Sequence, residues 1–506
     1  MRWRFAAICL LAAFTCSGGV TQSTDSAKLR DSYLMQAGEA ARQIRDTRDR
    51  VYALTQVATA LHRYGHSTEA RAAYLEAFSQ FDAMPVADSQ KQGLAMLFLD
   101  DPEVMERVAQ RITDARFRDR MYEMTLRRVG RKWETKGTED LLAKIQSQET
   151  RERTLLHLLQ ASRGSCDGAA VNEIPPRLEL PQFRAQALVV LAECARRKKA
   201  PSATLYAEAI DLAMKVKSDP RVRATLRAEA DPCDRASGYA EGDWALYRIA
   251  SSQASGGLTQ SAIKTVSRIE DATARANAHA MLAGLLARLK QFDDAMAVVG
   301  GLPSEGCRAA AFQQIAPSLW ASGSETEAMR LIPGVEYPGP RAYALADVAS
   351  RQVLAKRLDE ARALLLDAAE AALRIKDYQD RLGATLYAAA VQRKVDAADS
   401  VVTLTRLISA LQDWRKQEPN RWPPTAGSIG ASLAQAGAFE QALALISELS
   451  ASYRAPAMRR VAEASVKGGL APHVVAWLAG ISDPFEKCFA FLGIAHGLGG
   501  AGFPME

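Results

Sequence analysis

The stretch Arg308-Ala-Ala-Ala-Phe-Gln-Gln-Ile-Ala316 decides the fold, because the chain repeats its pattern at a fixed interval. The same pattern occurs in Arg275-Ala-Asn-Ala-His-Ala-Met-Leu-Ala283 and in Gly242-Asp-Trp-Ala-Leu-Tyr-Arg-Ile-Ala250. Successive openings, at residues 242, 275, 308 and 341, are 33 residues apart. A constant period of this length is typical of stacked helical repeats.

Each unit has small or apolar residues at offsets 3, 7, 8 and 20 from its opening residue. Offsets 3, 7 and 8 share one face of a helix, and alanine on that face lets two helix axes approach closely. A glycine or lysine near offset 15 ends the first helix, and a second helix begins near offset 17. Each unit is therefore expected to be two antiparallel helices. The residues near offset 15 are Gly257, Lys290, Gly323 and Lys356.

This pattern resembles the tetratricopeptide repeat, in its small residue at offset 8, its turn glycine and its alanine at offset 20. Gly323-Ser-Glu-Thr-Glu-Ala328 and Gly65-His-Ser-Thr-Glu-Ala70 look like the turn of that family. The tryptophan usual at offset 4 is absent, and some spacings are 40 residues. The resemblance covers about 242–500, extends to 50–81, and implies an all-α, right-handed α-solenoid of stacked antiparallel helix pairs.

A shared junction precedes several first helices, for example Ile269-Glu-Asp271 before Arg275. We expect the isoleucine to close the preceding helix against the core. The aspartate is placed to accept hydrogen bonds from the free amides of the next helix, and the basic residue could pair with that aspartate. The other junctions are Ile44–Asp46, Ile112–Asp114, Ile375–Asp377 and Ile481–Asp483.

The start of the chain has the features of a secretory signal peptide. Arg2 and Arg4 precede the apolar run Phe5–Phe14, and small residues follow as far as Gly19. The protein is therefore expected to be exported, to the periplasm or outside the cell. Acylation of Cys16 is an alternative that would anchor the chain to a membrane. The expected order is signal peptide 1–19, linker 20–28, irregular helical repeats 29–163, loop or kink 164–182, repeat array 183–500 and tail 501–506.

Charge and cysteine usage exclude some classes of function. The formal net charge is +6, with acidic and basic residues interleaved, so no nucleic-acid footprint is visible. Five cysteines follow Cys16, an odd number without pair spacing. That count argues against a disulfide framework but is compatible with a single bond such as Cys166 to Cys194.

No catalytic, cofactor or metal motif emerges from the sequence. His62 and His66 are four residues apart, but Gly65 lies between them and a third ligand is missing. Asp293-Asp294 and Asp100-Asp101 are neighbours that would cap helices or face solvent rather than converge on one substrate atom. The sequence thus predicts a protein without enzymatic activity, bound cofactor or metal.

The resemblance implies a peptide-binding groove on the concave face, lined by offsets 2, 5, 6, 9 and 12 of the first helices. Aromatic, arginine and amide side chains there are the types that such grooves use. We therefore expect a protein or peptide partner of unknown identity. An extracellular α/α-toroid carbohydrate-active enzyme and a passive spacer in an envelope complex remain alternatives. The candidate groove residues are Tyr52, Gln56, Trp244, Tyr247, Arg248, Asn277, Gln313, Gln314, Trp320, Tyr343, Asp347, Tyr387, Arg393, Arg459 and Arg460.

Overall fold

The structure is a computed structural model that describes residues 24–84, 93–98, 101–129, 137–162, 166–216, 241–332, 335 and 337–499. In this part of the chain every regular element is a helix. The expected signal peptide with Cys16 and the tail 501–506 lie outside the described residues. Across the described ranges, no helix combines the length and the apolar character that a membrane span requires.

Helix contacts divide the chain into two units, which are described separately. Unit 1 comprises Met1–Met121 and Ala372–Glu506, and unit 2 comprises Tyr122–Ala371. The boundaries fall within α7 (Ala115–Val129) and α21 (Leu358–Leu373). Unit 1 contains α2 (Thr24–Arg42), α3 (Thr47–Arg63), α4 (Ser67–Ala83), η1 (Met96–Phe98), α6 (Pro102–Ala109), α22 (Tyr378–Gln392), α23 (Ala397–Ala410), α24 (Gln412–Gln417), α25 (Trp422–Gln435), α26 (Phe439–Ser447), α27 (Ala451–Lys467), α28 (Ala471–Leu478) and α29 (Pro484–Leu498).

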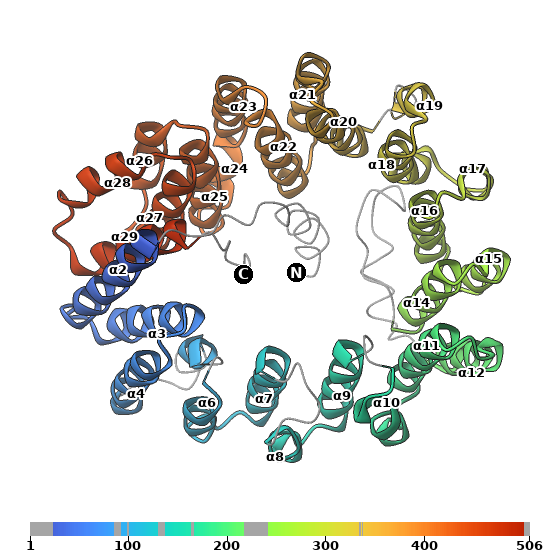
Figure 1. Ribbon diagram of the computed structural model, residues 1–506, viewed down its shortest axis with the longest axis horizontal. Helices are drawn as coiled ribbons and strands as arrows, with labels where there is room; N and C mark the ends of the chain where they lie inside the picture. The colour runs from blue at the N-terminus through green and yellow to red at the C-terminus, as the bar shows by residue number, and fades with distance from the viewer. Residues whose placement is uncertain are drawn as a thin grey trace. The chain divides into compact units, whose positions relative to one another are not determined.

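Unit 2 is a stack of antiparallel helix pairs. In Figure 1 the first helices α14, α16, α18 and α20 form one layer, and their partners α15, α17, α19 and α21 form the other. Its elements are α8 (Thr138–Lys144), α9 (Gln148–Ser162), α10 (Ala169–Glu173), η2 (Pro175–Arg177), α11 (Pro181–Arg197), α12 (Ala203–Lys215), α14 (Glu241–Ser255), α15 (Thr259–Val266), α16 (Ala272–Arg288), α17 (Phe292–Gly300), α18 (Glu305–Ala321), α19 (Glu325–Leu331) and α20 (Pro338–Leu354).

The predicted apolar face is the core between these pairs. Every residue at offsets 3, 7, 8 and 20 of the four 33-residue units is 0% exposed. A helix pair cannot bury such a face alone, so each pair depends on its neighbours. The chain is a helical repeat protein with an all-α solenoid fold. The buried residues are Ala245, Ile249, Ala250, Ala262, Ala278, Leu282, Ala283, Ala295, Ala311, Ile315, Ala316, Ala328, Ala344, Val348, Ala349 and Ala361.

The turn inside each pair has one geometry. The residue near offset 15 has a positive φ, +80° at Gly257 and +64° at Lys290. The following amide then reaches back into the first helix, as where Gln291 N donates to Leu286 O over 2.9 Å. This pattern satisfies carbonyls that the end of a helix would otherwise leave without a partner.

The junctions cap helices at both ends, in part differently from the prediction. The aspartates at 46, 114, 271, 377 and 483 accept hydrogen bonds from amides of the next helix, as predicted. The predicted pairing of the basic residue with that aspartate is wrong. Arg275 instead donates to the carbonyl of Ile269 over 2.7 Å, and Arg381 does the same to Ile375. The isoleucine carbonyl lies at the C-terminal end of the preceding helix, where it has no hydrogen-bond partner within that helix. It therefore attracts the arginine guanidinium.

Unit 1 contains a helix pair whose members come from opposite ends of the chain. The repeat pattern of the sequence predicts only a first helix after Lys487, and a single helix, from Leu29 to about Arg45, before the unit that opens at Arg50. In the structure α2 packs along α29, and α3 follows as the next first helix (Figure 1). We call α29 and α2 the end pair. Tyr33 and Phe491 meet inside it, with ring centroids 5.9 Å apart.

Several boundaries differ from those expected. Helix α2 begins at Thr24, inside the expected linker 20–28, and ends at Arg42. The expected loop at 164–182 contains α10 and η2, and lies inside unit 2 rather than between units. Cys166 and Cys194 form a disulfide bond there, and Cys307 is also disulfide-bonded. Cys488 is a buried free thiol.

Candidate functional site

The first helices of unit 2 carry a repeated strip of half-buried side chains. Offsets 2 and 6 lie one helical turn apart and are only partly covered by neighbouring helices. Because α14, α16, α18 and α20 pack side by side, these positions form a row across four helices. We call this set the first-helix row. It consists of Trp244, Arg248, Asn277, Met281, Ala310, Gln314, Tyr343 and Asp347.

The row is narrower than the predicted groove. Tyr247, at offset 5, is 9% exposed and packs with its ring centroid 5.4 Å from that of Trp244. Trp320, at offset 12, is 7% exposed, and the Arg357 guanidinium lies 5.0 Å from its ring centroid. Both side chains were predicted to face the groove, but they are packed against neighbouring helices. Gln313 is half-buried on α18.

A close helix contact fixes one member of the row. Arg288 on α16 donates to the side-chain oxygen of Gln314 over 2.7 Å. Gln314 reaches this position by crossing Gly284, where an added Cβ would lie 2.8 Å from the Gln314 Cβ. Glycine at 284 thus allows the side chain of Gln314 to lie against α16 and to reach Arg288.

Three predicted groove residues, Tyr52, Gln56 and Arg459, make contacts around the end pair instead. The Tyr52 ring stacks on Phe489, with centroids 5.4 Å apart and planes at 24°. Gln56 accepts a hydrogen bond of 2.7 Å from Arg459. Tyr52 and Gln56 are half-buried on α3 and face α29 and α27. They do so because, within unit 1, the C-terminal helices of the chain stack directly on the N-terminal ones.

The remaining predicted residues do not join the first-helix row. Tyr387 and Arg393 belong to α22 and its C-terminal cap in unit 1, and both are half-buried. Burial lowers the pKa of Arg393. Arg460 donates to the hydroxyl of Ser428 over 3.3 Å, between α27 and α25. These contacts hold the helices of unit 1 together.

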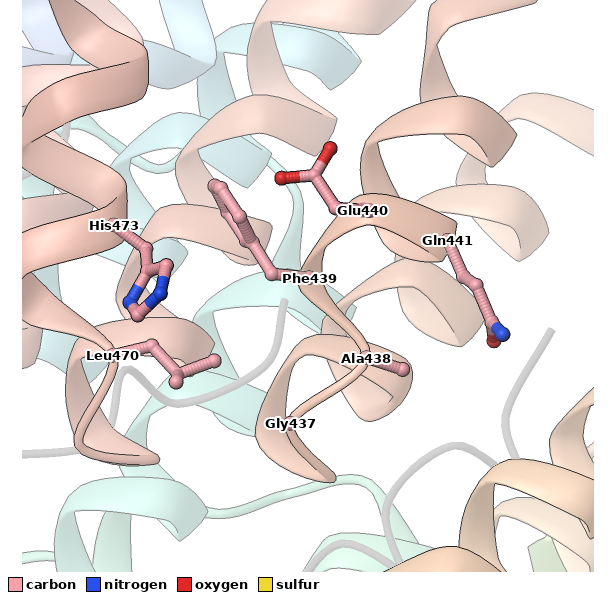
Figure 2. A pocket seen from close by; sticks show the side chains of 7 residues that line it. All are labelled: Gly437, Ala438, Phe439, Glu440, Gln441, Leu470 and His473. Carbon is pink, nitrogen blue, oxygen red and sulfur yellow. The ribbon is translucent and has the colours of Figure 1, made fainter.

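Unit 1 has a small pocket between two turns (Figure 2). Its volume is about 330 Å³, and it lies where α26 and α28 begin. Figure 2 shows the Phe439 ring between His473 and Glu440, with Gln441 turned away from them. Phe439 also meets Trp477 edge to face, with ring centroids 5.8 Å apart. The interposed ring separates the imidazole from the carboxylate, so the two do not form an acid–base pair.

A second pocket, of about 460 Å³, lies where α29 begins. Arg454 and Glu486 line it and pair with each other at 2.6 Å. Trp477, Met458 and Ile481 provide the apolar part of its wall. Asp483, also in the wall, accepts a hydrogen bond from the Glu486 amide, so the charged groups of this pocket are already engaged with one another.

Histidines and carboxylates do not cluster in the part of the chain that the structure describes. No group of three or more His, Cys, Asp or Glu residues is placed there to hold a metal ion. His66 lies 3.2 Å from Asp31, whereas His62 belongs to the last turn of α3. Asp101 accepts hydrogen bonds from the first amides of α6, which is the capping role that the sequence suggested.

Neither the end pair nor the arginine–carbonyl contacts were predicted from the sequence. The end pair had one available signal, since an unpaired first helix at one end of the chain can complement an unpaired second helix at the other. The arginine contacts had the constant spacing of six residues from the junction isoleucine to the basic residue.

Comparison with known proteins gives little further guidance. No protein-family model matches the chain, and no curated protein matches it. The crystal structure of Ton1535 from Thermococcus onnurineus NA1 aligns with 71% of this chain and 95% of the Ton1535 chain, at 16% identity and a TM-score of 0.22. A circular tandem repeat protein with novel repeat topology aligns over 93% of this chain and 96% of its own chain, at 13% identity and a TM-score of 0.13. At such TM-scores neither similarity carries an argument about function.

Proposed function

We propose that the protein is an exported, non-catalytic scaffold of tetratricopeptide-like repeats that binds a protein or peptide segment along the first-helix row. The observation that carries this proposal is the row itself, which presents aromatic, cationic, amide and acidic side chains on four successive helices. Such a mixture suits peptide recognition, in which aromatic anchors supply binding energy and polar groups fix the register.

The row also suggests the size and charge of the segment. Three helix-to-helix steps of about 9 Å separate Arg248 from Asp347, or roughly 27 Å in total. An extended peptide of about eight residues spans this length. Arg248 at one end favours an acidic residue of the ligand, and Asp347 at the other end favours a basic one. The proposed ligand is therefore an extended segment with opposite charges near its two ends.

Export has separate support. The basic and apolar start of the chain is typical of a secretory signal peptide. The disulfide between Cys166 and Cys194 suits an oxidising compartment, where such bonds persist. Measurement of the mature N-terminus by mass spectrometry tests this part of the proposal. A chain that retains residues 1–19 after expression in a secreting host would contradict it.

A charge-swap experiment tests the binding site. Labelled eight-residue peptides with an acidic end and a basic end, in both orders along the chain, are titrated with the mature protein by fluorescence anisotropy. We expect one order to be preferred, and the variant Arg248→Glu/Asp347→Lys to prefer the other. The matched control is Lys264→Glu/Asp294→Lys, which changes the same charges on the second helices. Absence of binding by all peptides, or a preference that the swap leaves unchanged, would contradict the proposal.

A further inference from the structure

The turns inside the helix pairs of unit 2 form a continuous edge that carries lysines in a strained backbone conformation. The left-handed residue of each turn alternates between lysine and glycine along the stack. We call the five turns together the turn edge. Its left-handed residues are Lys199, Gly257, Lys290, Gly323 and Lys356.

Contacts between neighbouring turns show that they lie side by side. An added Cβ at Gly256 would lie 3.0 Å from Cδ of Arg196, so the ends of α11 and α14 are adjacent. Thr259 donates to Gln291 over 2.9 Å, which joins the turns after α14 and α16. Arg357 pairs with Glu325, which joins the turns after α18 and α20. These contacts, together with the packing of α16 against α18, place the five turns along one side of unit 2.

The lysines stand where glycine is the residue with the least strain. Their φ angles are +57°, +64° and +62°, in the region that side chains with a Cβ rarely adopt. The equivalent turns of unit 1 have glycine, at Gly65, Gly437 and Gly469. In the described part of the chain, every non-glycine residue with a positive φ is one of these three lysines. A requirement for positive charge at these turns would explain why the strain is tolerated.

Exposed leucines lie on three of the five turns, beside Gly257, Lys290 and Lys356. Leu258 is 40% exposed, Leu289 is 39% exposed and Leu354 is 62% exposed, and Leu358 lies beside Lys356 on the last turn. Each lysine is itself exposed, and none of the three forms an ion pair within the described residues. Large apolar side chains exposed on three turns of one edge are unusual on a surface that only meets water.

Acidic residues near the edge belong to the first turns of the second helices. Arg357 pairs with two of them, Glu325 and Glu360. Asp293 and Asp294 lie on α17, after the turn that holds Lys290. Lys198 and Arg357 also lie in the turns, but Lys198 pairs with Asp167 and Arg357 with these glutamates. Among the described residues, the charges of the turns that have no ion partner are therefore those of the three lysines.

We propose that the turn edge of unit 2 docks on an anionic lipid surface, with lysines against the headgroups and leucines in the interfacial layer. Lysine attracts anionic lipid over short range, and leucine gains free energy by leaving water. The proposal concerns a different surface from the first-helix row. It does not require acylation of Cys16, because the edge itself supplies both kinds of contact.

A stability-matched variant tests the proposal. Lys199→Gly/Lys290→Gly/Lys356→Gly removes the charges and also the backbone strain, so the variant is expected to unfold no earlier than the wild type. Co-sedimentation is measured with phosphatidylcholine vesicles that contain, or lack, phosphatidylglycerol. The wild type should bind the anionic vesicles more tightly, and the triple variant should lose on the order of a hundredfold in affinity for them. Added salt should weaken wild-type binding.

Two further variants separate the contributions. Lys215→Gln/Lys264→Gln/Lys376→Gln removes the same net charge elsewhere on the surface and should bind like the wild type. Leu289→Ser/Leu354→Ser should weaken binding with the lysines intact. The proposal fails if the wild type does not bind anionic vesicles, or binds both kinds of vesicle equally. It also fails if the glycine variant and the charge-matched control bind alike, because net charge alone would then explain the binding. Absence of binding to every vesicle would point instead to an acidic protein as the partner of this edge.

Discussion

Arg459 donates a hydrogen bond of 2.7 Å to Gln56, although 403 residues separate the two along the chain. Arg459 lies on α27 and Gln56 on α3, and α29 packs against both of these helices. The contact shows that the repeats of unit 1 stack without interruption from the C-terminal helices to the N-terminal ones. The half repeat at each end of the chain is thereby completed by the other.

Loss of this contact should weaken unit 1. Arg459→Ala leaves the half-buried amide of Gln56 without its charged donor, and we expect the free energy of unfolding to fall by about 1.5–3 kcal/mol. Urea titration of Arg459→Ala, Gln56→Ala and the double variant measures the coupling between them. Arg460→Ala, which loses only the 3.3 Å contact to Ser428, is the neighbouring control and should cost less. Strictly additive effects of the two single substitutions would show that the contact contributes nothing.

A methyl group at Gly493 should disrupt the packing of α29 on α27. Its Cβ would meet the backbone oxygen of Arg459 at 2.3 Å and the Cβ of Ala462 at 2.8 Å. Backbone cannot move aside cheaply, so Gly493→Ala should lower the free energy of unfolding by about 1–3 kcal/mol or more. Gly300→Ala is the control, since no atom lies within 4 Å of its added Cβ. Equal thermal stability of both variants would mean that the two helices are not in close contact.

His496 should make unit 1 sensitive to acid. It is 0% exposed beside Tyr64, and burial lowers its pKa from 6.5 to about 2, with Arg459, Arg63 and Lys467 adding to the effect. Between these values the unfolded chain binds a proton that the folded chain does not, so stability falls as the pH drops below 6.5. At pH 5 the loss is about 2 kcal/mol.

The variant His496→Leu removes this titration. Its free energy of unfolding, measured by urea titration from pH 8 to about pH 4, should fall less steeply in acid than that of the wild type. The exposed His473→Leu serves as the matched control and should keep the wild-type slope. Parallel curves for the wild type and His496→Leu would place the imidazole in contact with water.

The disulfide in unit 2 should contribute strongly to its stability. The bond joins residues 28 apart, Cys166 before α10 and Cys194 in α11. Closing a loop of this length removes chain entropy from the unfolded state, which corresponds to about 3–4 kcal/mol. Cys166→Ser/Cys194→Ser should therefore unfold at lower urea concentration than the wild type. Reducing agent should shift this transition less than it shifts that of the wild type, because the bond at Cys307 then remains in unit 2. Cys488→Ala, which removes a free thiol in unit 1, is the control. An unchanged transition would argue that the bond does not form in solution.

Local regularity explains what could be predicted from the sequence. The 33-residue register placed every residue at offset 8, such as Ala283 and Ala316, in the core, because a face shared by all units must be buried between them. The capping role of Asp271 followed from its position before a helix. Such features depend on neighbours within a few turns of chain.

The rest depends on contacts between distant segments or on side-chain reach. Tyr52 has the spacing of a groove residue, yet it stacks on Phe489, which no local pattern reveals. Tyr247 and Trp320 were expected to face a groove, but neighbouring helices cover both side chains, whereas offsets 2 and 6 stay partly open. Arg275 has the spacing for an ion pair, but its long side chain reaches the carbonyl of Ile269 instead.

Crosslinking across the ends of the chain tests the account most directly. The variant Gln56→Cys/Arg459→Cys is treated, in its native state, with a short bifunctional thiol reagent, and the native free thiol Cys488 is fully buried and protected. Because α3 and α27 are neighbours of α29, we predict an intramolecular link between positions 56 and 459 in the monomer. The link should not form efficiently when the protein is unfolded in urea before the reagent is added. Links formed only between molecules, or no link in the folded protein, would contradict the pairing of the two chain ends.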